Sequence, residues 1–444
     1  MTKKKYSFFS RISQELTLVN AQEWPALLWS FTYFLSLLCS YYIIRPIRDE
    51  MGIAGGVDQL QWLFTATFIA VLVMVPLFGW ITSRYPRRVF LPTIYYFFIT
   101  NLLVFFLLFE YVQNQLYVAR TFFVWTSVFN LFAVSVFWSF MTDLYSNTQA
   151  KRLFSLIAAG GTCGALLGPA LTALLVGPLG ANKLLLISAA LLTVCIFSVK
   201  KLSSWRESNS GNPSTEKKEE NGTQIKTDKK QDNPLGGSVL AGIRLVFHSP
   251  YLLGICALML LFTTLATFLY FQQAQIIHDN FTDSNSRTAV FAIIDFITNA
   301  LTLCLQIFVS AHLIKHWGLP HTLAFIPLLL ALGFGLLALA PTLIVIVIVQ
   351  VIRRAGNYAI MRPAREMLYV VLDREEKYKA KNFIDTSIYR AGDMISAWCY
   401  AGLQSLGLGL AAIAVLSIPI ALLWAKLSHS LGKRQLHLSE QQID

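Results

Sequence analysis

Long apolar stretches alternate with short polar connections along most of the chain. Because a helix needs about 20 apolar residues to cross a bilayer, twelve of these stretches predict membrane-spanning helices. Their approximate limits are residues 26–45, 60–82, 89–109, 119–143, 153–177, 182–199, 250–272, 288–312, 321–340, 342–366, 383–405 and 408–427. The pattern predicts an all-α integral membrane protein with twelve transmembrane helices.

One long polar segment interrupts this pattern. Residues 200–236 are rich in Lys, Glu, Ser, Asn and Gly and show no hydrophobic periodicity, which is typical of a flexible linker. The segment separates six predicted helices from the other six. We expect, in order, a cytoplasmic amphipathic N-terminus, a six-helix bundle, a cytoplasmic linker, a second six-helix bundle and a cytoplasmic tail, at residues 1–25, 26–199, 200–249, 250–427 and 428–444.

Composition and charge place the chain in a membrane. Of 444 residues, 55% are hydrophobic and only 14% are charged, which is too apolar for a soluble protein. The net charge of +12 would suit a nucleic-acid partner, but the basic residues gather on one side of the twelve-helix plan. Positively charged loops stay in the cytoplasm. We therefore expect both termini in the cytoplasm and no nucleic acid as a partner.

The two predicted bundles resemble each other in sequence. Residues 42–49 correspond to 271–279, and residues 149–154 correspond to 379–384. Two parallel six-helix repeats joined by a cytoplasmic linker are the plan of a secondary transporter whose binding site lies between the halves.

Two further patterns resemble the major facilitator superfamily. The loop after the second predicted helix matches the family's loop at Gly79, Arg84, Arg87 and Arg88. Ser83 and Pro86 replace the family's acid and second glycine there. The fifth predicted helix resembles the family's glycine-proline pattern at Gly160, Gly161, Gly164, Gly168 and Pro169. Small residues let helix backbones approach closely, so we interpret these glycines as packing positions.

A narrower resemblance involves residues 45–49 and 149–161. Both segments are similar to the ATP/ADP translocase-like (NTP/NDP exchange transporter) family, in particular to its shorter bacterial members. In nucleotide carriers of that family a basic residue precedes the aspartate that ends the first span. Arg48 and Asp49 occupy those places. The resemblance implies a major facilitator fold, nucleotide exchange and a bacterial inner membrane.

The charged end of the first predicted helix is the first candidate site. Arg45, Arg48 and Asp49 fall at i, i+3 and i+4 and share one helical face. A charge at membrane depth costs roughly 2.5 to 3.5 kcal/mol on insertion scales, so it pairs with another charge or faces a polar space. We interpret the stretch as an anion-attracting patch on a helix that Pro46 kinks. The alternative is a belt of side chains that reach the membrane surface and only end the span.

The tenth and eleventh predicted helices carry further charges. Arg354, Tyr358, Arg362 and Arg365 recur at spacings of four, four and three, which predicts one shared helical face. Arg390 and Asp393 are three residues apart and are expected to pair. Asp295 lies alone inside the eighth predicted helix. It either carries a proton, because desolvation raises the pKa of a buried carboxyl, or neutralises an arginine.

These residues form the predicted site. Several arginines together bind phosphate or carboxylate groups through paired hydrogen bonds. We predict as substrate ligands Arg45, Arg48, Arg353, Arg354, Tyr358, Arg362 and Arg390, and as gating or coupling groups Asp49, Asp295 and Asp393. No catalytic residue, metal ligand or cofactor is expected, and the chain has no GxxxxGK[ST] phosphate loop that would drive transport by ATP hydrolysis.

The sequence favours a secondary active transporter that moves an organic anion by alternating access, and the narrower resemblance suggests nucleotide exchange. One alternative is a proton-coupled exporter of amphiphilic or chelating anions such as lipids, siderophores or drugs. Another is a membrane sensor or scaffold that uses residues 200–236 for interaction. The expected partners are the small anion and membrane lipid, and a monomer suffices.

Overall fold

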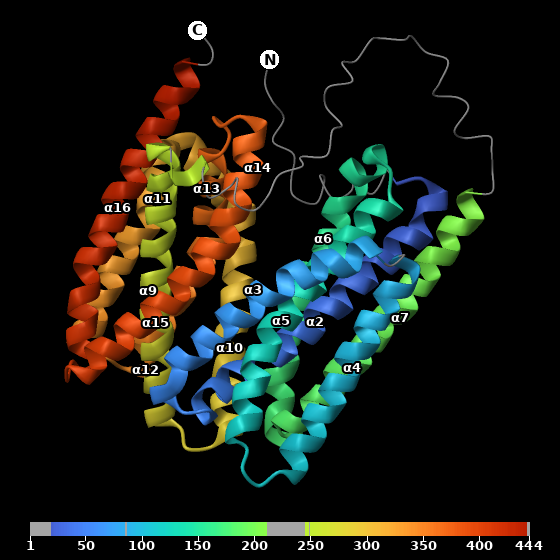
Figure 1. The fold of residues 1–444 in the computed structure, drawn as a ribbon, viewed down its shortest axis with the longest axis horizontal. Coiled ribbons are helices and arrows are strands. Elements are labelled where there is room, and N and C mark those ends of the chain that lie inside the picture. The colour runs from blue at the N-terminus through green and yellow to red at the C-terminus, as the bar shows by residue number, and fades with distance from the viewer. Residues whose placement is uncertain (1–18, 85–86, 211–244, 248, 442–444) are drawn as a thin grey trace. The chain divides into compact units, whose positions relative to one another are not determined.

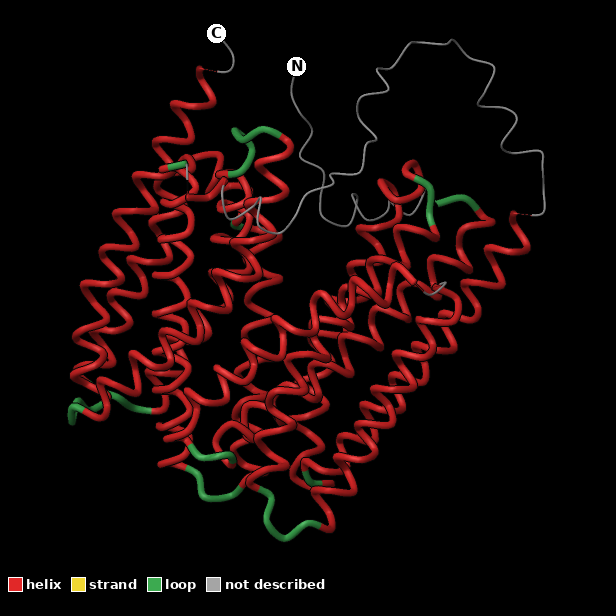
Figure 2. The backbone as a smooth tube through the Cα atoms, viewed as in Figure 1, coloured by secondary structure: helices red, strands yellow, loops and turns green. Residues whose placement is uncertain are grey.

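The computed structural model describes residues 19–84, 87–210, 245–247 and 249–441, and these residues are almost entirely helical (Figure 2). Most of the predicted linker and of the predicted N-terminus lies outside the described residues. In chain order (Figure 1) the elements are η1 (Ala21–Glu23), α2 (Trp24–Ala54), η2 (Val57–Gln59), α3 (Leu60–Arg84), α4 (Arg87–Tyr111), α5 (Leu116–Leu144), α6 (Asn147–Leu179), α7 (Ala181–Ser210), α9 (Pro250–Asn280), α10 (Ser284–Phe308), α11 (Ser310–Leu339), α12 (Leu343–Gly356), η4 (Asn357–Met361), α13 (Arg362–Leu368), α14 (Arg374–Phe383), η5 (Ile384–Ile388), α15 (Tyr389–Ser405) and α16 (Leu410–Gln441).

Eleven helices of the described chain are long and apolar enough to cross a membrane. The remaining predicted span, residues 383–405, lies in the helical run from α14 through η5 to α15. It is more polar than the others because it carries Asp385, Arg390 and Asp393. The predicted fold class, an all-helical membrane protein, is confirmed by these elements.

The Cα positions of the described residues group into two compact units. The first takes described residues within Met1–Ile47, Met74–Gln113 and Trp125–Lys226, and the second takes those within Arg48–Val73, Asn114–Val124 and Thr227–Asp444. The boundary therefore falls inside α2, α3 and α5. One end of each of these helices belongs to the same unit as α9–α16. The two units therefore differ from the two bundles predicted from the sequence, residues 26–199 and 250–427.

In the first unit, α2 packs closely against α6. A Cβ atom added to Gly164 would collide with the backbone of Leu35 and Cys39, and one added to Gly168 would lie 2.8 Å from the Cys39 carbonyl oxygen. Gly161 meets the ring of Phe34 in the same way. The predicted packing role of these glycines is confirmed: the two backbones approach where no side chain separates them.

Replacing Gly164 by alanine is expected to destabilise the first unit by about 1–3 kcal/mol, the usual cost of overpacking, because the new methyl group meets backbone that cannot move aside. The measurement is the thermal midpoint of the purified protein in detergent. Gly177→Ala on the same helix is the control, since nothing lies within 4 Å of its added Cβ. Equal losses in both variants would contradict the packing argument.

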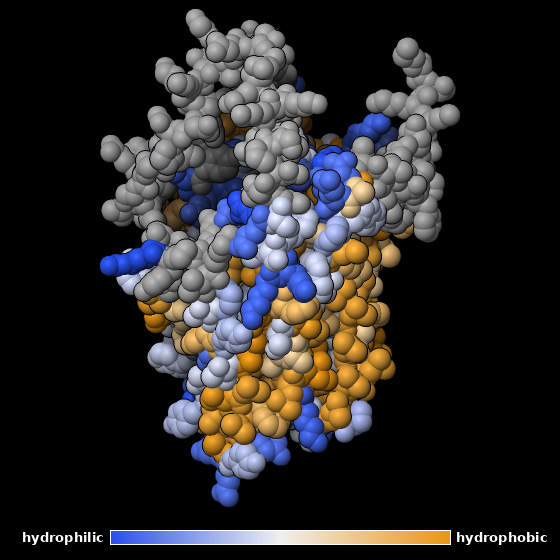
Figure 3. Space-filling view, turned by 90° about the vertical axis from the view of Figure 1, so that its right-hand side faces the viewer, coloured by the Kyte–Doolittle hydropathy of each residue, from blue (hydrophilic) through white to orange (hydrophobic). Residues whose placement is uncertain are grey.

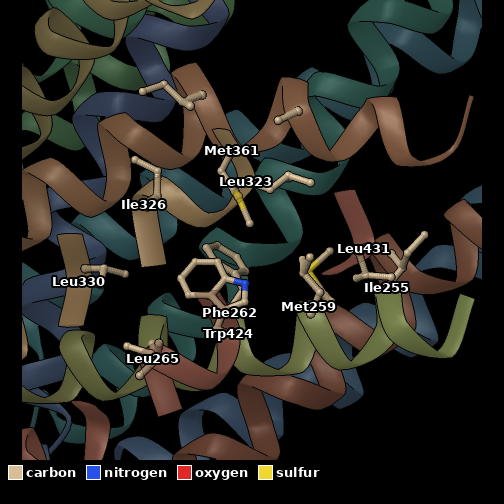
Figure 4. Packing of buried hydrophobic residues seen from close by; sticks show 14 of the residues in the cluster. Ile255, Met259, Phe262, Leu265, Leu323, Ile326, Leu330, Met361, Trp424 and Leu431 are labelled. Atoms are coloured by element: carbon tan, nitrogen blue, oxygen red, sulfur yellow. The ribbon is translucent and has the colours of Figure 1, made fainter. Parts of the chain in front are cut away.

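The second unit has a large hydrophobic core between α9, α11, α12, α13 and α16. Trp424 and Phe262 lie next to each other with their rings tilted by 53°, and Met361, Met259 and Leu265 lie around them (Figure 4). The two rings have centroids 5.8 Å apart. Burial of such side chains stabilises a helix bundle through dense packing, so this core holds α12 and α13 in place.

Large apolar side chains also cover much of the outside of the helices. The face shown in Figure 3 is largely hydrophobic, with hydrophilic residues near its ends. On α4 alone, Phe97 and Leu107 are exposed by 56% and 49%. An exposed apolar surface of this extent needs lipid around it.

Two π-helical turns, η4 and η5, interrupt the tenth and eleventh predicted helices. Pro363 follows η4 and has no N–H, so it cannot donate to the Ala359 carbonyl four residues earlier. The hydroxyl of Ser310, at the start of α11, donates a hydrogen bond to that carbonyl. Single π turns of this kind are frequent at functional sites.

Candidate functional site

The charged end of α2 belongs to the second unit, where it meets α5 and α9. Arg48 Nη1 donates to Asp49 Oδ1 at 2.9 Å, and the guanidinium carbon lies 3.9 Å from the centroid of the Phe123 ring. The Tyr270 hydroxyl donates to the same Asp49 oxygen at 3.2 Å. The charge of Arg48 is thus stabilised by a carboxylate on one side and an aromatic face on the other.

A second group of charges lies on α12 and α15 of the same unit. Arg390 Nη1 lies 3.6 Å from Asp393 Oδ2, which confirms the predicted local pair. Asp393 is also close enough to Arg48 and Arg353 to interact electrostatically with both. The second unit therefore brings Arg48, Arg353 and Arg390, which are far apart in the sequence, around one carboxylate.

Two tyrosines border this group. Tyr389 interacts electrostatically with Asp393, Arg353 and Tyr358. Arg353 Nε donates to Gln350 Oε1 at 3.0 Å. With three guanidinium groups and phenol rings near one another, the arrangement suits an anionic group attached to a planar ring.

The predicted single face of the tenth helix is wrong. Arg354 and Arg365 are 8% exposed, whereas Arg362 is exposed. The π turn η4 changes the angular position of every later residue relative to a regular α-helix. As a result Arg353, and not Arg354, lies with Tyr358 near Tyr389.

Arg354 points to α10. Its Nη2 lies 2.5 Å from Asp295 Oδ1, and the two side chains are only 9% and 2% exposed. Of the two roles left open for Asp295, the pairing with an arginine is the one that the structure shows. Arg354, predicted as a substrate ligand, has its charge neutralised inside the bundle in this conformation.

The remaining predicted ligands lie elsewhere. Arg45 belongs to the first unit, where its guanidinium lies over the Tyr42 ring at 5.7 Å. Arg362 interacts electrostatically with Asp385. Arg365, which was predicted to share a helical face with Arg354, pairs with Asp385 at 3.3 Å.

One ion pair near the end of α2 was not predicted. Glu50 accepts hydrogen bonds from Arg287 Nε and Nη2, both at 2.7 Å. In the predicted twelve-helix plan Glu50 follows residues 26–45 and Arg287 precedes residues 288–312, which places both on the extracytoplasmic side. Their position on the same side of the membrane in the predicted plan was the feature of the sequence that could have indicated this pair.

The N-cap of α10 lies beside Arg287. Asp283 accepts hydrogen bonds from the Ser286 backbone N–H at 2.8 Å and from the Ser286 hydroxyl at 2.9 Å. These bonds hold the pKa of the Asp283 carboxyl below its usual range, and the nearby Arg287 charge adds to the effect. Asp283 therefore stays ionised and fixes the start of α10.

The segment 149–161 also gains a physical explanation. In the first unit, Glu23 accepts hydrogen bonds from Gln149 Nε2 at 3.0 Å and from both terminal nitrogens of Arg152 at 3.0 and 3.2 Å. Glu23 is 5% exposed. These residues join the start of α2 to the start of α6. They hold the bundle together, and we assign them no contact with substrate.

Within the described residues there is no group of three or more His, Cys, Asp or Glu side chains that would hold a metal ion. The charged groups described above are arginines paired with single carboxylates, and this chemistry fits binding of anions rather than metals.

Apolar helices with buried charges in their interior define a multi-pass membrane transporter. The model of the family described as "Major Facilitator Superfamily" matches residues 27–368, more than half of the chain. The protein belongs to this superfamily and is a secondary transporter, not an enzyme.

Solved structures agree with this fold. The nucleoside transporter NupG is 14% identical with a TM-score of 0.61 over 94% of this chain and 99% of its own. A POT family transporter in complex with 5-aminolevulinic acid is 13% identical, with a TM-score of 0.58 over 94% and 96%. A bacterial homolog of the human lysosomal transporter Spinster is 12% identical, with a TM-score of 0.55 over 95% and 99%. At these identities the likeness extends to the fold alone. Among curated proteins, none matches the chain.

Proposed function

We propose that the protein carries an organic anion by alternating access and that Arg48, Arg353 and Arg390 bind the anionic group. The observation that carries this proposal is the gathering of these arginines around Asp393 in the second unit. Arg48 reaches the group from α2, and the others reach it from α12 and α15. An anion bound to all of them would link segments that the chain separates widely.

The balance of charge supports an anionic substrate. The arginines contribute three positive charges, and Asp49 and Asp393 contribute two negative ones. Burying an excess positive charge is costly, so an added anion lowers the energy of the closed site. An empty site would resist closing, which favours exchange of one anion for another over net transport.

Within this class we propose nucleotides as the exchanged anions. The support is the resemblance of residues 45–49 and 149–161 to the NTP/NDP exchange transporters, with Arg48 and Asp49 at the end of α2. Phosphate groups bind arginine through paired hydrogen bonds, and Tyr358 and Tyr389 would stack on a base. NupG, a carrier of similar fold, is a nucleoside transporter. A bacterial inner membrane, cytoplasmic termini and a monomer belong to the same proposal.

The test is uptake of labelled ATP or ADP by liposomes that contain the purified protein. We expect uptake only when the liposomes hold unlabelled nucleotide, and we expect it to be lost in Arg390→Gln. Equal uptake by empty and loaded liposomes would contradict exchange. No uptake of nucleotide in either case would remove nucleotides as the substrate and leave the assignment as a transporter intact.

A second candidate is proton-coupled export of amphiphilic or chelating anions. Asp393 favours it, because an anion that displaces this carboxylate from the arginines would leave it without its counter-charge. Such a carboxylate takes up a proton. Uptake driven by a pH gradient and lost in Asp393→Asn would support this candidate, and indifference to the gradient would exclude it.

A further inference from the structure

Two histidines of the second unit lie next to each other between α11 and α16. The rings of His321 and His429 have centroids 5.0 Å apart, and their planes meet at 65°. His321 is exposed and His429 is partly exposed. In the predicted twelve-helix plan, residues 321–340 begin and residues 408–427 end on the cytoplasmic side. The pair therefore lies where the two helices meet water, and dissolved ions can reach it.

Close packing of the two helices holds this pair in place. A Cβ atom added to Gly432 would lie 2.6 Å from the Cα atom of Pro320, so the two backbones approach closely about one turn from His429. Leu323 of α11 and Leu431 of α16 are buried in one hydrophobic cluster, and the two helices run side by side (Figure 1). The core of the unit thus fixes the separation of the two rings.

A hydrogen bond to the backbone sets the tautomer of His321. Its Nδ1 lies 2.9 Å from the carbonyl oxygen of Trp317, and because a carbonyl oxygen only accepts, Nδ1 carries the proton. The lone pair of the neutral ring is then on Nε2. Between the two residues, Gly318 interrupts the helix with a left-handed backbone conformation (φ 72°). Histidines that bind metals donate their other ring N–H to a carbonyl or carboxylate in the same way.

The spacing of the two rings matches that of two imidazoles on one metal ion. A zinc–nitrogen bond is about 2.0–2.1 Å long, so a ring centre lies about 3.2 Å from the ion. Two such rings at the tetrahedral angle have centroids about 5 Å apart, and the separation of His321 and His429 is 5.0 Å. This separation and the lone pair on His321 Nε2 are the features that a shared ion requires.

We propose that His321 and His429 bind a divalent transition-metal ion, Zn²⁺ or Cu²⁺, which joins α11 to α16. Neutral imidazole is a preferred ligand of these ions. No third His, Cys, Asp or Glu joins the pair within the described residues, so water fills the other positions and the ion exchanges with solution. Lys426 and Lys433 lie three residues before and four residues after His429, and both are exposed. Their charges lower the affinity for a cation, and salt screens this effect.

The test measures zinc binding by competition with a chromophoric chelator. The full chain is purified through a tag without histidine and carries His312→Ala and His316→Ala. These two residues form another ring pair on α11, with centroids 4.1 Å apart, and their four-residue spacing also suits a metal. In this background we expect His321→Ala or His429→Ala to lower the affinity for Zn²⁺ at least about tenfold, because even the outer partners of a metal ligand contribute about 10–100-fold.

His437→Ala is the matched control, because His437 is an exposed histidine of α16 outside the pair. Its affinity for Zn²⁺ should stay within about twofold of the background protein, since distant sites act independently. Thermal midpoints without metal show whether each variant folds, and His429→Gln takes the place of His429→Ala if the alanine variant does not. Added Zn²⁺ should raise the midpoint of the background protein and of His437→Ala, but not that of the variants of the pair.

Copper provides a second measurement. The electron paramagnetic resonance spectrum of one equivalent of Cu²⁺ should show two ring nitrogens in the background protein and fewer in His321→Ala and His429→Ala. Unchanged zinc affinity in both of these variants would overturn the proposal, and so would an equal loss in His437→Ala. A copper spectrum with two ring nitrogens that persists without His429 would overturn it as well. None of these results depends on which anion the protein carries.

Discussion

Replacing Arg390 by glutamine is expected to lower the initial rate of anion uptake about 100-fold, because the variant removes one of the three guanidinium groups that bind the anion through charge-assisted hydrogen bonds. Arg390 is the only one of the three proposed anion ligands on α15, and its side chain is 30% exposed and thus reachable by substrate. The variant also removes one of the guanidinium groups near Asp393. The site therefore loses both its affinity for the anion and its excess positive charge.

The measurement is uptake into loaded liposomes over a range of substrate concentrations. Arg434→Gln on α16 is the matched control, because Arg434 is an exposed arginine of the same unit, and its uptake should equal wild type. If Arg390→Gln transports normally, then the arginine group around Asp393 is not the substrate site.

Replacing Asp295 by asparagine is expected to destabilise the second unit by about 3–5 kcal/mol. The change leaves Arg354 as a buried charge without its carboxylate, since the pair is separated by 2.5 Å and is almost fully enclosed. The double variant Asp295→Asn/Arg354→Gln removes both charges. It should recover most of the lost stability, because an uncharged pair has no desolvation cost of that size.

Thermal midpoints of the single and double variants in detergent show whether the two substitutions have non-additive effects on stability. Lys381→Gln is the control. Lys381 pairs with Glu366 at 2.6 Å, but the two side chains are 33% and 40% exposed, and such pairs contribute about 0–1 kcal/mol. If the double variant is as unstable as Asp295→Asn alone, the two residues do not act as a pair.

The candidate site shows where inference from sequence succeeds. The local pair of Arg390 and Asp393 follows from their spacing on one helix and is present. The glycines of α6 were assigned to packing because they lack side chains, and α2 lies against them. The first result depends on neighbours that a regular helix places at fixed separations, and the second on small residues, which let two helix backbones approach closely.

The same reasoning fails at the tenth predicted helix. Counting in steps of three and four assumes an unbroken α-helix, whereas the five residues of η4 form a π turn. Pro363 and the Ser310 hydrogen bond to Ala359 accompany this turn, and the Ser310 contact comes from another helix. Arg353, before the turn, interacts electrostatically with Tyr389 of α15, and Arg354 pairs with Asp295 of α10, while the residues after the turn are rotated away from the predicted face.

The sequence by itself determined the class of this protein. Bilayer thickness sets the length of an apolar helix, and unsatisfied backbone groups are too costly in lipid for other structures, so hydropathy alone predicts a bundle of membrane helices. Only the tertiary structure decided which charges on different helices meet. Glu50 and Arg287 are separated by 237 residues. The spacing of residues along one helix or loop cannot predict a contact over such a separation, so this ion pair depends on how the helices pack.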